Sequence, residues 1–282
     1  EQQPRADNFR SLQFRLAMLL NISHTTTYRY DLPVPYALQR LRLTPQNSSS
    51  QTVHNWSVRF HGAVKEATFS DGFNNICELI RHERSAQEIS ITAEGAVTTH
   101  GNTGVFGEDK RLSPLWMYTR QTELTAPGGG ISELAMSYGT VPDRLELLHS
   151  LMGVVASRMR YEIGTTDVET AAEAALLAGH GVCQDLTHVF CAAARLNGIP
   201  ARYVSGYLMM DGVEHQAASH AWAEAHVGGL GWVGFDPANN MSPDERYVRI
   251  AAGLDYRDAA PISGIRLGSG REKLEVSVKV EQ

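Results

Sequence analysis

One segment of this sequence reads Gly179-His180-Gly181-Val182-Cys183-Gln184-Asp185-Leu186-Thr187-His188, and the organisation of the whole chain follows from it. A glycine-punctuated turn leads into an apolar, alanine-rich run that ends at Asn197-Gly198. These start and stop signals predict a helix with Cys183 at or near its first turn. Unpaired backbone N–H groups and the helix dipole favour negative charge there. Because the thiolate is the nucleophilic form of cysteine, we predict that Cys183 is reactive.

The other two cysteines have ordinary surroundings. Cys191 lies in the middle of the same predicted helix among alanines, and Cys77 lies in a strand-like run. Buried cysteine commonly packs as a small apolar residue, so we predict that both belong to the core. Three cysteines without paired spacing indicate neither a disulfide framework nor a zinc site, which favours a reducing, cytoplasmic location.

Composition limits the kind of protein. The chain has 282 residues, of which 43% are hydrophobic and 20% charged, as expected for one large or two ordinary packed domains. A net charge of −6 argues against nucleic acid as a partner. No apolar run approaches the roughly 20 residues that span a bilayer, so no membrane association is expected. Residues 1–17 are polar, lack the features of a signal peptide and are predicted to be an extension.

The N-terminal third alternates between apolar and polar residues. Turn residues such as Ser70-Asp71-Gly72 separate six such segments. Alternation of period two is typical of half-buried strands, and six strands at short spacing predict a β-sandwich-like domain over residues 18–105. The predicted strands are 19–30, 38–44, 56–60, 64–69, 75–81 and 87–99.

The rest of the chain predicts an α+β domain. Residues 106–130, with Pro127-Gly128-Gly129-Gly130, are interpreted as a linker with one short helical piece. Residues 131–265 follow as helices and then strands joined by short turns. The last segment, 266–282, contains a cleanly alternating strand that could complete either domain's sheet. The predicted helices are 131–138, 142–159, 170–178 and the one at Cys183, and the predicted strands are 201–209, 217–227 and 232–236.

A nucleophilic cysteine needs a base, and the base needs an acceptor that orients it. His220 and Asp236 lie on two consecutive predicted strands. An odd-length hairpin loop would put both side chains on one face of the sheet. With a five-residue loop, 227–231, they would be diagonal neighbours, and with seven residues directly opposite. We therefore predict a Cys183-His220-Asp236 constellation, with the backbone N–H of Cys183 as one donor of an oxyanion hole.

Other titratable groups compete for these roles. His180 in the turn and His188 on the helix are rival bases, although His188 should point elsewhere. Asp185 opposes thiolate formation by like charge but stabilises the start of a helix. Glu224 and His226 are interpreted as a solvated or structural pair.

Four blocks of this sequence resemble the transglutaminase-like superfamily, in particular its bacterial two-domain members with an N-terminal β domain. In the block at 253–261, Leu254 stands where the family has arginine. The resemblance covers nearly all of residues 18–280. The blocks are Gly179-His180-Gly181-Val182-Cys183-Gln184-Asp185, Gly198-Ile199-Pro200-Ala201-Arg202-Tyr203-Val204-Ser205-Gly206-Tyr207, Ser219-His220-Ala221-Trp222-Ala223-Glu224 through Gly234-Phe235-Asp236-Pro237, and Gly253-Leu254-Asp255-Tyr256-Arg257-Asp258-Ala259-Ala260-Pro261.

The resemblance implies a papain-like α+β core and a Cys-His-Asp triad on Cys183, His220 and Asp236. It also implies cysteine-dependent hydrolysis or acyl transfer at amide bonds of peptides or proteins through a thioester, and we favour peptidase-type hydrolysis. Amine transfer to protein glutamine, and a non-catalytic binding module that keeps the fold, remain alternatives. No cofactor is expected, and no metal, because no acidic loop has a calcium-ligand pattern. Association into a homo-oligomer stays open.

Overall fold

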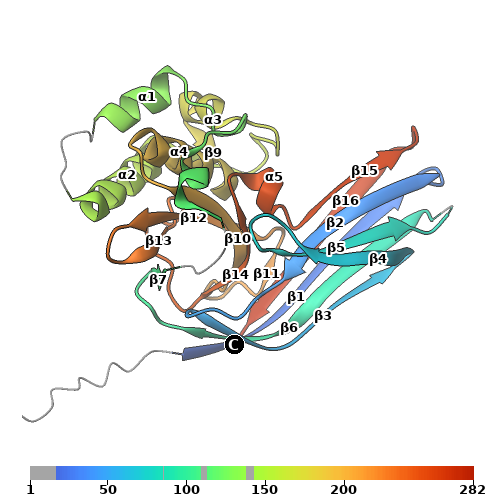
Figure 1. Cartoon of the computed structure of the whole chain (residues 1–282). Helices are drawn as coiled ribbons and strands as arrows, with labels where there is room; N and C mark the ends of the chain where they lie inside the picture. The colour runs from blue at the N-terminus through green and yellow to red at the C-terminus, as the bar shows by residue number, and fades with distance from the viewer. Residues whose placement is uncertain (1–16, 85, 109–112, 138–142) are drawn as a thin grey trace, which may run out of the picture.

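The computed structural model describes residues 17–84, 86–108, 113–137 and 143–282 (Figure 1). Ala17 already belongs to the first strand. The predicted extension up to residue 16 and the predicted helix start at Pro142 lie outside the described residues.

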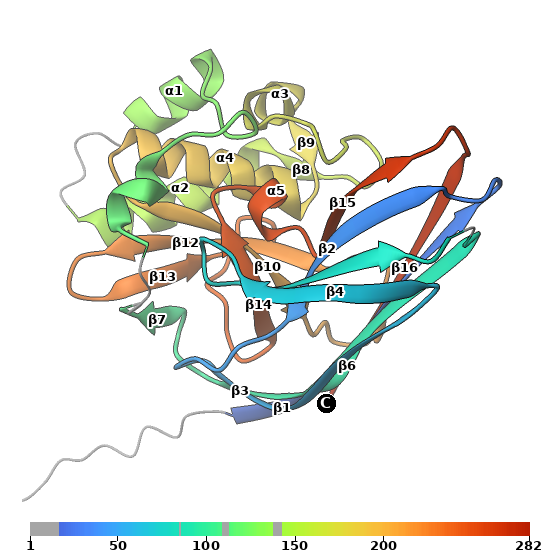
Figure 2. The same ribbon diagram turned by 45° about the vertical axis from the view of Figure 1, so that its right-hand side comes forward.

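Two sheets face each other in the N-terminal part of the chain (Figure 2). One has the order β11-β16-β1-β6-β3 and the other β15-β2-β5-β4, and their inner faces enclose a core that includes Tyr28, Leu41, Ile80 and Ile91. The six strands predicted by alternation all form, and β1 and β6 show most clearly the alternation of buried and less buried residues that a strand with one apolar face has. They are β1 (Ala17–Tyr30), β2 (Tyr36–Thr44), β3 (Gln51–His61), β4 (Ala63–Ser70), β5 (Ile76–His82) and β6 (Glu88–His100).

The C-terminal end of the chain returns to these sheets. Strand β15 (Ile262–Leu267) pairs with β2, and β16 (Glu272–Glu281) pairs along β1. The predicted segment 266–282 thus adds its strand to an N-terminal sheet. The chain already rejoins the N-terminal sheets at Ile262, before the domain boundary at residue 265 that the sequence predicted.

A separate five-stranded sheet lies at the centre of the rest of the chain. Its order is β14-β10-β12-β13-β7, and helix α4 packs on it between α1, α2 and α3. The segment interpreted as a linker contributes β7 to this sheet through Gly107, which pairs with Trp232. The elements are β7 (Val105–Gly107), η1 (Leu115–Thr119), α1 (Gly129–Met136), α2 (Arg144–Arg158), β8 (Arg160–Tyr161), α3 (Ala172–Ala178), β9 (His180–Gly181), α4 (Cys183–Leu196), β10 (Ala201–Leu208), β11 (His215–Gln216), β12 (His220–Val227), β13 (Gly231–Phe235), β14 (Tyr247–Gly253) and α5 (Tyr256–Ala259).

The two parts share a buried interface. Leu20, Val97 and Val280 of the N-terminal sheet belong to one apolar cluster with Cys183 and Tyr207 of the core. One half of each long strand therefore packs in the sandwich, and the other half packs against the core domain. Within the described residues, no helix is long and apolar enough to cross a membrane.

Candidate active site

Helix α4 places Cys183 at its first position. Gly179 ends α3 in the left-handed conformation (φ 72°), two residues of β9 follow, and Val182 is the N-cap of α4. Every residue from Cys183 to Arg195 is buried. Ala192–Ala194 belong to one apolar cluster with Ala223 and Ala225 of β12. Such small side chains let the helix approach the sheet closely. The predicted helix and the position of Cys183 in its first turn are confirmed.

Asp185 caps this helix. Its Oδ2 accepts hydrogen bonds from the backbone N–H of Val182 (2.8 Å) and from Thr166 Oγ1 (2.7 Å). Burial raises the pKa of Asp185, although these hydrogen bonds oppose the shift. The carboxyl group thus satisfies the backbone N–H of the N-cap residue Val182, as the third helical residue does in a capping box.

Gly181 leaves the space that this cap requires. A Cβ at Gly181 would lie 2.7 Å from both Cβ and Oδ2 of Asp185. We expect Gly181→Ala to lower the free energy of unfolding by about 1–3 kcal/mol, because the cap must move. Thermal unfolding measures the loss, with Gly228→Ala as control, since a Cβ at Gly228 meets no atom within 4 Å. Equal stability of the two variants would contradict this account of the cap.

The hairpin of β12 and β13 brings His220 to Asp236. Val227 pairs with Gly231 and Ala223 with Phe235, so the register continues to Trp222 opposite Asp236. His220 is then the diagonal neighbour of Asp236 on the same face, which is the register of the five-residue alternative. The loop itself is shorter than predicted, residues 228–230, because Val227 and Gly231 already pair. His220 Nε2 and Asp236 Oδ2 are 2.7 Å apart.

Asp236 is buried and surrounded by donors. Besides His220, its Oδ2 accepts from Asn239 Nδ2 (2.7 Å) and from the hydroxyl of Tyr247 (2.8 Å). Its Oδ1 accepts from the backbone N–H groups of Ala238 (2.9 Å) and Asn239 (3.1 Å). Burial alone would raise the pKa of Asp236, but the bond to His220, its charge and these donors lower it below the usual value. The carboxylate is therefore held ionised beside the imidazole.

The protonation of His220 depends on both Asp236 and Cys183. Burial acts to lower the pKa of His220, but hydrogen bonds to Asp236 and to Cys183, together with their charges, outweigh it and raise the pKa to about 10. An imidazolium between a carboxylate and a thiolate is stabilised by both neighbours. The surroundings of His220 therefore favour its protonated, imidazolium form.

The raised pKa predicts a pH-dependent stability. A histidine with a higher pKa in the folded than in the unfolded state stabilises the fold fully below about pH 6.5, and this contribution is lost as pH rises towards about 10. The difference in unfolding free energy between the wild type and His220→Gln should therefore be largest near pH 6 and shrink towards pH 10. Urea denaturation across this range measures it, and a difference that grows with pH would contradict the assignment.

The rival groups serve other purposes. His188 is fully buried, accepts the backbone N–H of Tyr256 at Nε2 (3.0 Å), and has its pKa lowered to about 3 by burial and by Arg195. His180 lies on β9, whose backbone pairs with β8. The contact with Asp236 belongs to His220.

The interpretation of Glu224 and His226 as a pair is wrong. Glu224 is fully buried and forms an ion pair with Arg202 (2.5 Å) and one with Arg249 (3.2 Å), whereas His226 contacts Glu108 (3.3 Å). A buried carboxylate needs charged partners, and β10 and β14 supply them.

The other two cysteines are core residues, as predicted. Both are 0% exposed, and burial raises the pKa of each thiol to about 11. Cys77 donates its S–H to Asp71 (3.5 Å). Cys183 differs in having a histidine within hydrogen-bonding contact.

Three site residues were missed by the sequence reasoning. Tyr247 lies on β14, a strand that has no alternating pattern in the sequence. Asn239 follows Asp236 by three residues in a turn, and the turn residues Asp236-Pro237-Ala238-Asn239 could have predicted it. Tyr161 of β8 lies opposite Gly181 and is half exposed. Burial and the charges of Cys183 and Asp236 raise the pKa of Tyr161 to about 12.

No group of three or more His, Cys, Asp or Glu side chains is arranged to hold a metal ion in the described parts of the chain.

Comparison with known proteins identifies the family of this chain. A model of the transglutaminase-like superfamily matches residues 133–237, and one of the bacterial transglutaminase-like N-terminal region matches 20–98. An uncharacterized protein of Mycobacterium leprae is 30% identical over 275 residues, which cover 93% of this chain and 98% of that protein. An uncharacterized protein of Mycobacterium tuberculosis is 29% identical over 309 residues, covering 98% and 96%.

A solved structure of a candidate cysteine protease from Cytophaga hutchinsonii shares the fold. The two structures superpose with a TM-score of 0.75 at 20% sequence identity, and the match covers 95% of this chain and 92% of the other. The α+β core and the N-terminal β region were both expected from the sequence. This chain belongs to the transglutaminase-like superfamily, in the group that carries the bacterial N-terminal region.

Proposed function

We propose that this protein is a cysteine-dependent hydrolase or acyl transferase acting on amide bonds of peptides or proteins, with Cys183 as nucleophile, His220 as base and Asp236 as the group that orients it. The observation that carries the proposal is the 2.7 Å contact between His220 and the buried carboxylate of Asp236, with Cys183 near enough to His220 to raise the pKa of its imidazole. The α4 start supplies the electropositive surroundings that a thiolate favours.

The reaction follows from these contacts. The Cys183 thiolate attacks the amide carbonyl, and the oxyanion that forms is stabilised by the backbone N–H of Cys183 at the helix start. The imidazolium of His220 donates its proton to the leaving amine, which breaks the C–N bond and leaves a thioester on Cys183. Neutral His220 then takes a proton from water as it attacks the thioester, releasing the carboxylic acid and the thiolate.

Hydrolysis and amine transfer differ only in the nucleophile that reaches the thioester. We propose peptidase-type hydrolysis, because neither the sequence nor the site marks a binding place for an amine. A reducing, cytoplasmic location fits a protein in which Cys77, Cys183 and Cys191 are all free.

Trapping the acyl-enzyme tests the proposal. The protein is incubated with a peptide library and quenched in acid, and the mass added to the peptide that contains Cys183 is determined. We expect an acyl adduct on Cys183 that hydroxylamine removes. The products with and without added methylamine separate hydrolysis from amine transfer. Absence of any adduct, together with binding of the same peptides, would support the binding-module alternative instead.

A further inference from the structure

Tyr247 links the candidate site to its surroundings. Its hydroxyl donates to Oδ2 of Asp236 (2.8 Å), the oxygen that also contacts Nε2 of His220 (2.7 Å). The ring of Tyr247 packs edge-on against Trp222, with centroids 5.4 Å apart, and lies 5.9 Å from the ring of His220. Tyr247 therefore fixes the oxygen that orients the imidazole.

The strand that carries Tyr247 is the edge of the core sheet. β14 pairs with β10, and its other edge faces the β domain. Ser205 pairs with Ala251 and Gly206 with Arg249, so Ile250 is an extra residue on β14. Such a bulge bends a strand and changes which backbone groups face outward. The backbone groups of Arg249 and Ala252 need partners outside the sheet.

Two side-chain amides of the β domain supply those partners. Gln51 donates to the carbonyl of Arg249 and accepts its N–H, both at 2.8 Å. Asn75 donates to the carbonyl of Ala252 (2.8 Å) and accepts its N–H (2.9 Å). A carboxamide has the same donor and acceptor as a peptide group, so each amide reproduces a two-bond pair of an antiparallel ladder. Both amides are buried.

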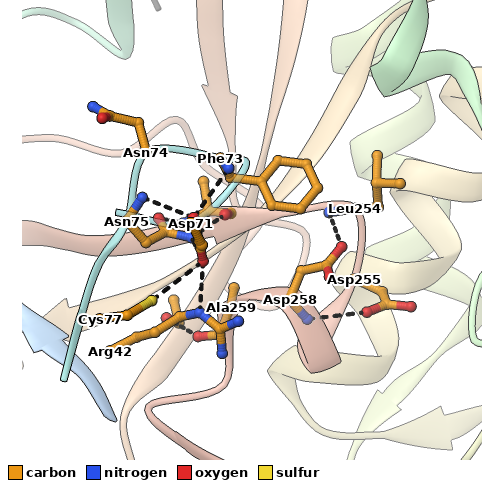
Figure 3. A network of polar contacts seen from close by, with 12 residues as sticks. Arg42, Asp71, Phe73, Asn74, Asn75, Cys77, Leu254, Asp255, Asp258 and Ala259 are labelled. Carbon is orange, nitrogen blue, oxygen red and sulfur yellow. Dashed lines mark hydrogen bonds and ion pairs between the residues drawn. The ribbon is translucent and has the colours of Figure 1, made fainter. Parts of the chain in front are cut away.

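Asn75 is itself held in orientation (Figure 3). Asp71 accepts hydrogen bonds from the backbone N–H and from the side-chain amide of Asn75, each at 3.0 Å. Asp71 in turn pairs with Arg42 (2.9 Å), whose side chain is 3% exposed. Gln51 is fixed by a further bond to the carbonyl of Gln46 (2.9 Å). The amides thus reach β14 from a rigid frame.

We propose that the β domain is a working part of the catalytic site: Gln51 and Asn75 hold β14, β14 positions Tyr247, and Tyr247 fixes the Asp236 carboxylate that orients His220. This inference rests on the proposed function for the roles of Cys183, His220 and Asp236. It assigns Gln51, Asn75 and Tyr247 as positioning residues that do not touch the substrate.

The test reads the thiolate of Cys183 directly. Alkylation by limiting iodoacetamide is followed from about pH 5 to 9 by peptide mapping, with Cys77 and Cys191 as internal references. Gln51→Met with Asn75→Leu removes both amides at similar side-chain size. In this double variant we expect Cys183 to be alkylated about tenfold more slowly near pH 6.5, and its rate to rise only at the higher pH at which an ordinary thiol ionises. The reason is that a less firmly held Asp236 carboxylate stabilises the imidazolium of His220 less.

Non-additivity distinguishes this route from general destabilisation. Tyr247→Phe should give the same loss, and the triple variant should react no more slowly than either, since all act through one contact. The inference would be overturned if the losses of alkylation rate at Cys183 multiplied in the triple variant. It would also be overturned if the rate in the double variant stayed within twofold of the wild-type rate. If the double variant does not fold, the single variant Gln51→Met, which removes only the pair of bonds to Arg249, takes its place.

Gln39→Leu is the matched control. Gln39 is a buried amide of the same domain that contacts His82 and has no bond to β14, so its loss should lower the melting temperature but leave the rate at Cys183 unchanged. An equal loss of rate in this control would overturn the inference. If Cys183 of the wild type were alkylated no faster than Cys77, the proposed function itself would be overturned, and the inference with it.

Discussion

Cys183→Ala is expected to abolish amide turnover while leaving the fold intact. The side chain is the only proposed nucleophile, and removing such a group from a triad costs about 10⁴–10⁶-fold in kcat. Cys183 is buried, with 8% exposure, and the substitution removes only its sulfur atom from an apolar cluster, so the loss of packing should be small. Turnover of the substrate found by acyl trapping, and thermal unfolding, are the two measurements.

Cys77→Ala is the control for this variant. Cys77 is a buried thiol of the β domain that contacts Asp71 and has no contact with His220. Its loss should reduce stability through a small cavity but preserve turnover per folded molecule. Full activity of Cys183→Ala would refute the mechanism, since water or another side chain would then have to carry the attack.

Asp236→Asn is expected to lower kcat about 10³–10⁴-fold with a smaller change in KM. The substitution removes the buried negative charge that supports the imidazolium of His220. It also sets an amide NH₂ among the donors of Tyr247, Asn239 and His220, all of which now point at carboxylate oxygens. Steady-state kinetics across pH measures the effect.

Asp244→Asn provides the comparison for Asp236→Asn. Asp244 precedes β14 and pairs with Arg246 (2.7 Å) near the surface, with 29% of its side chain exposed. A partly exposed pair contributes little to stability, so this variant should keep wild-type kinetics. If Asp236→Asn kept kcat within tenfold of the wild type, Asp236 would be a structural residue and His220 would have another orienting partner.

The local part of the site could be predicted from the sequence because its signals are short-range. Glycine and alanine usage around Cys183 marks the helix start, and strand alternation brings His220 and Asp236 to one face. The hairpin register stayed open between two loop lengths, because Gly228, Gly229 and Gly231 can each adopt positive φ and so permit several turns. Only the backbone pairing of Val227 with Gly231 settles it.

The long-range part could not be predicted because nothing in the local pattern encodes it. β14 lacks alternation: most of Tyr247–Gly253 is buried and a bulge at Ile250 breaks the period, so neither the strand nor Tyr247 was anticipated. Gln51 and Asn75 read as ordinary polar residues of strand ends, yet they bind a strand almost 200 residues away. Glu224 was interpreted as part of a solvated or structural pair with His226, but Arg202 of β10 and Arg249 of β14 make its burial tolerable.

The most direct test of the account is the pH profile of cysteine alkylation in the wild type and in His220→Ala. Free thiols titrate near pH 8.5, and thiols activated by a neighbouring imidazolium titrate well below that. The account predicts that Cys183 alone reacts fast near pH 6 and that His220→Ala removes this advantage. A Cys183 that titrates like an ordinary thiol in both proteins would show that no thiolate–imidazolium pair forms and would contradict the central claim.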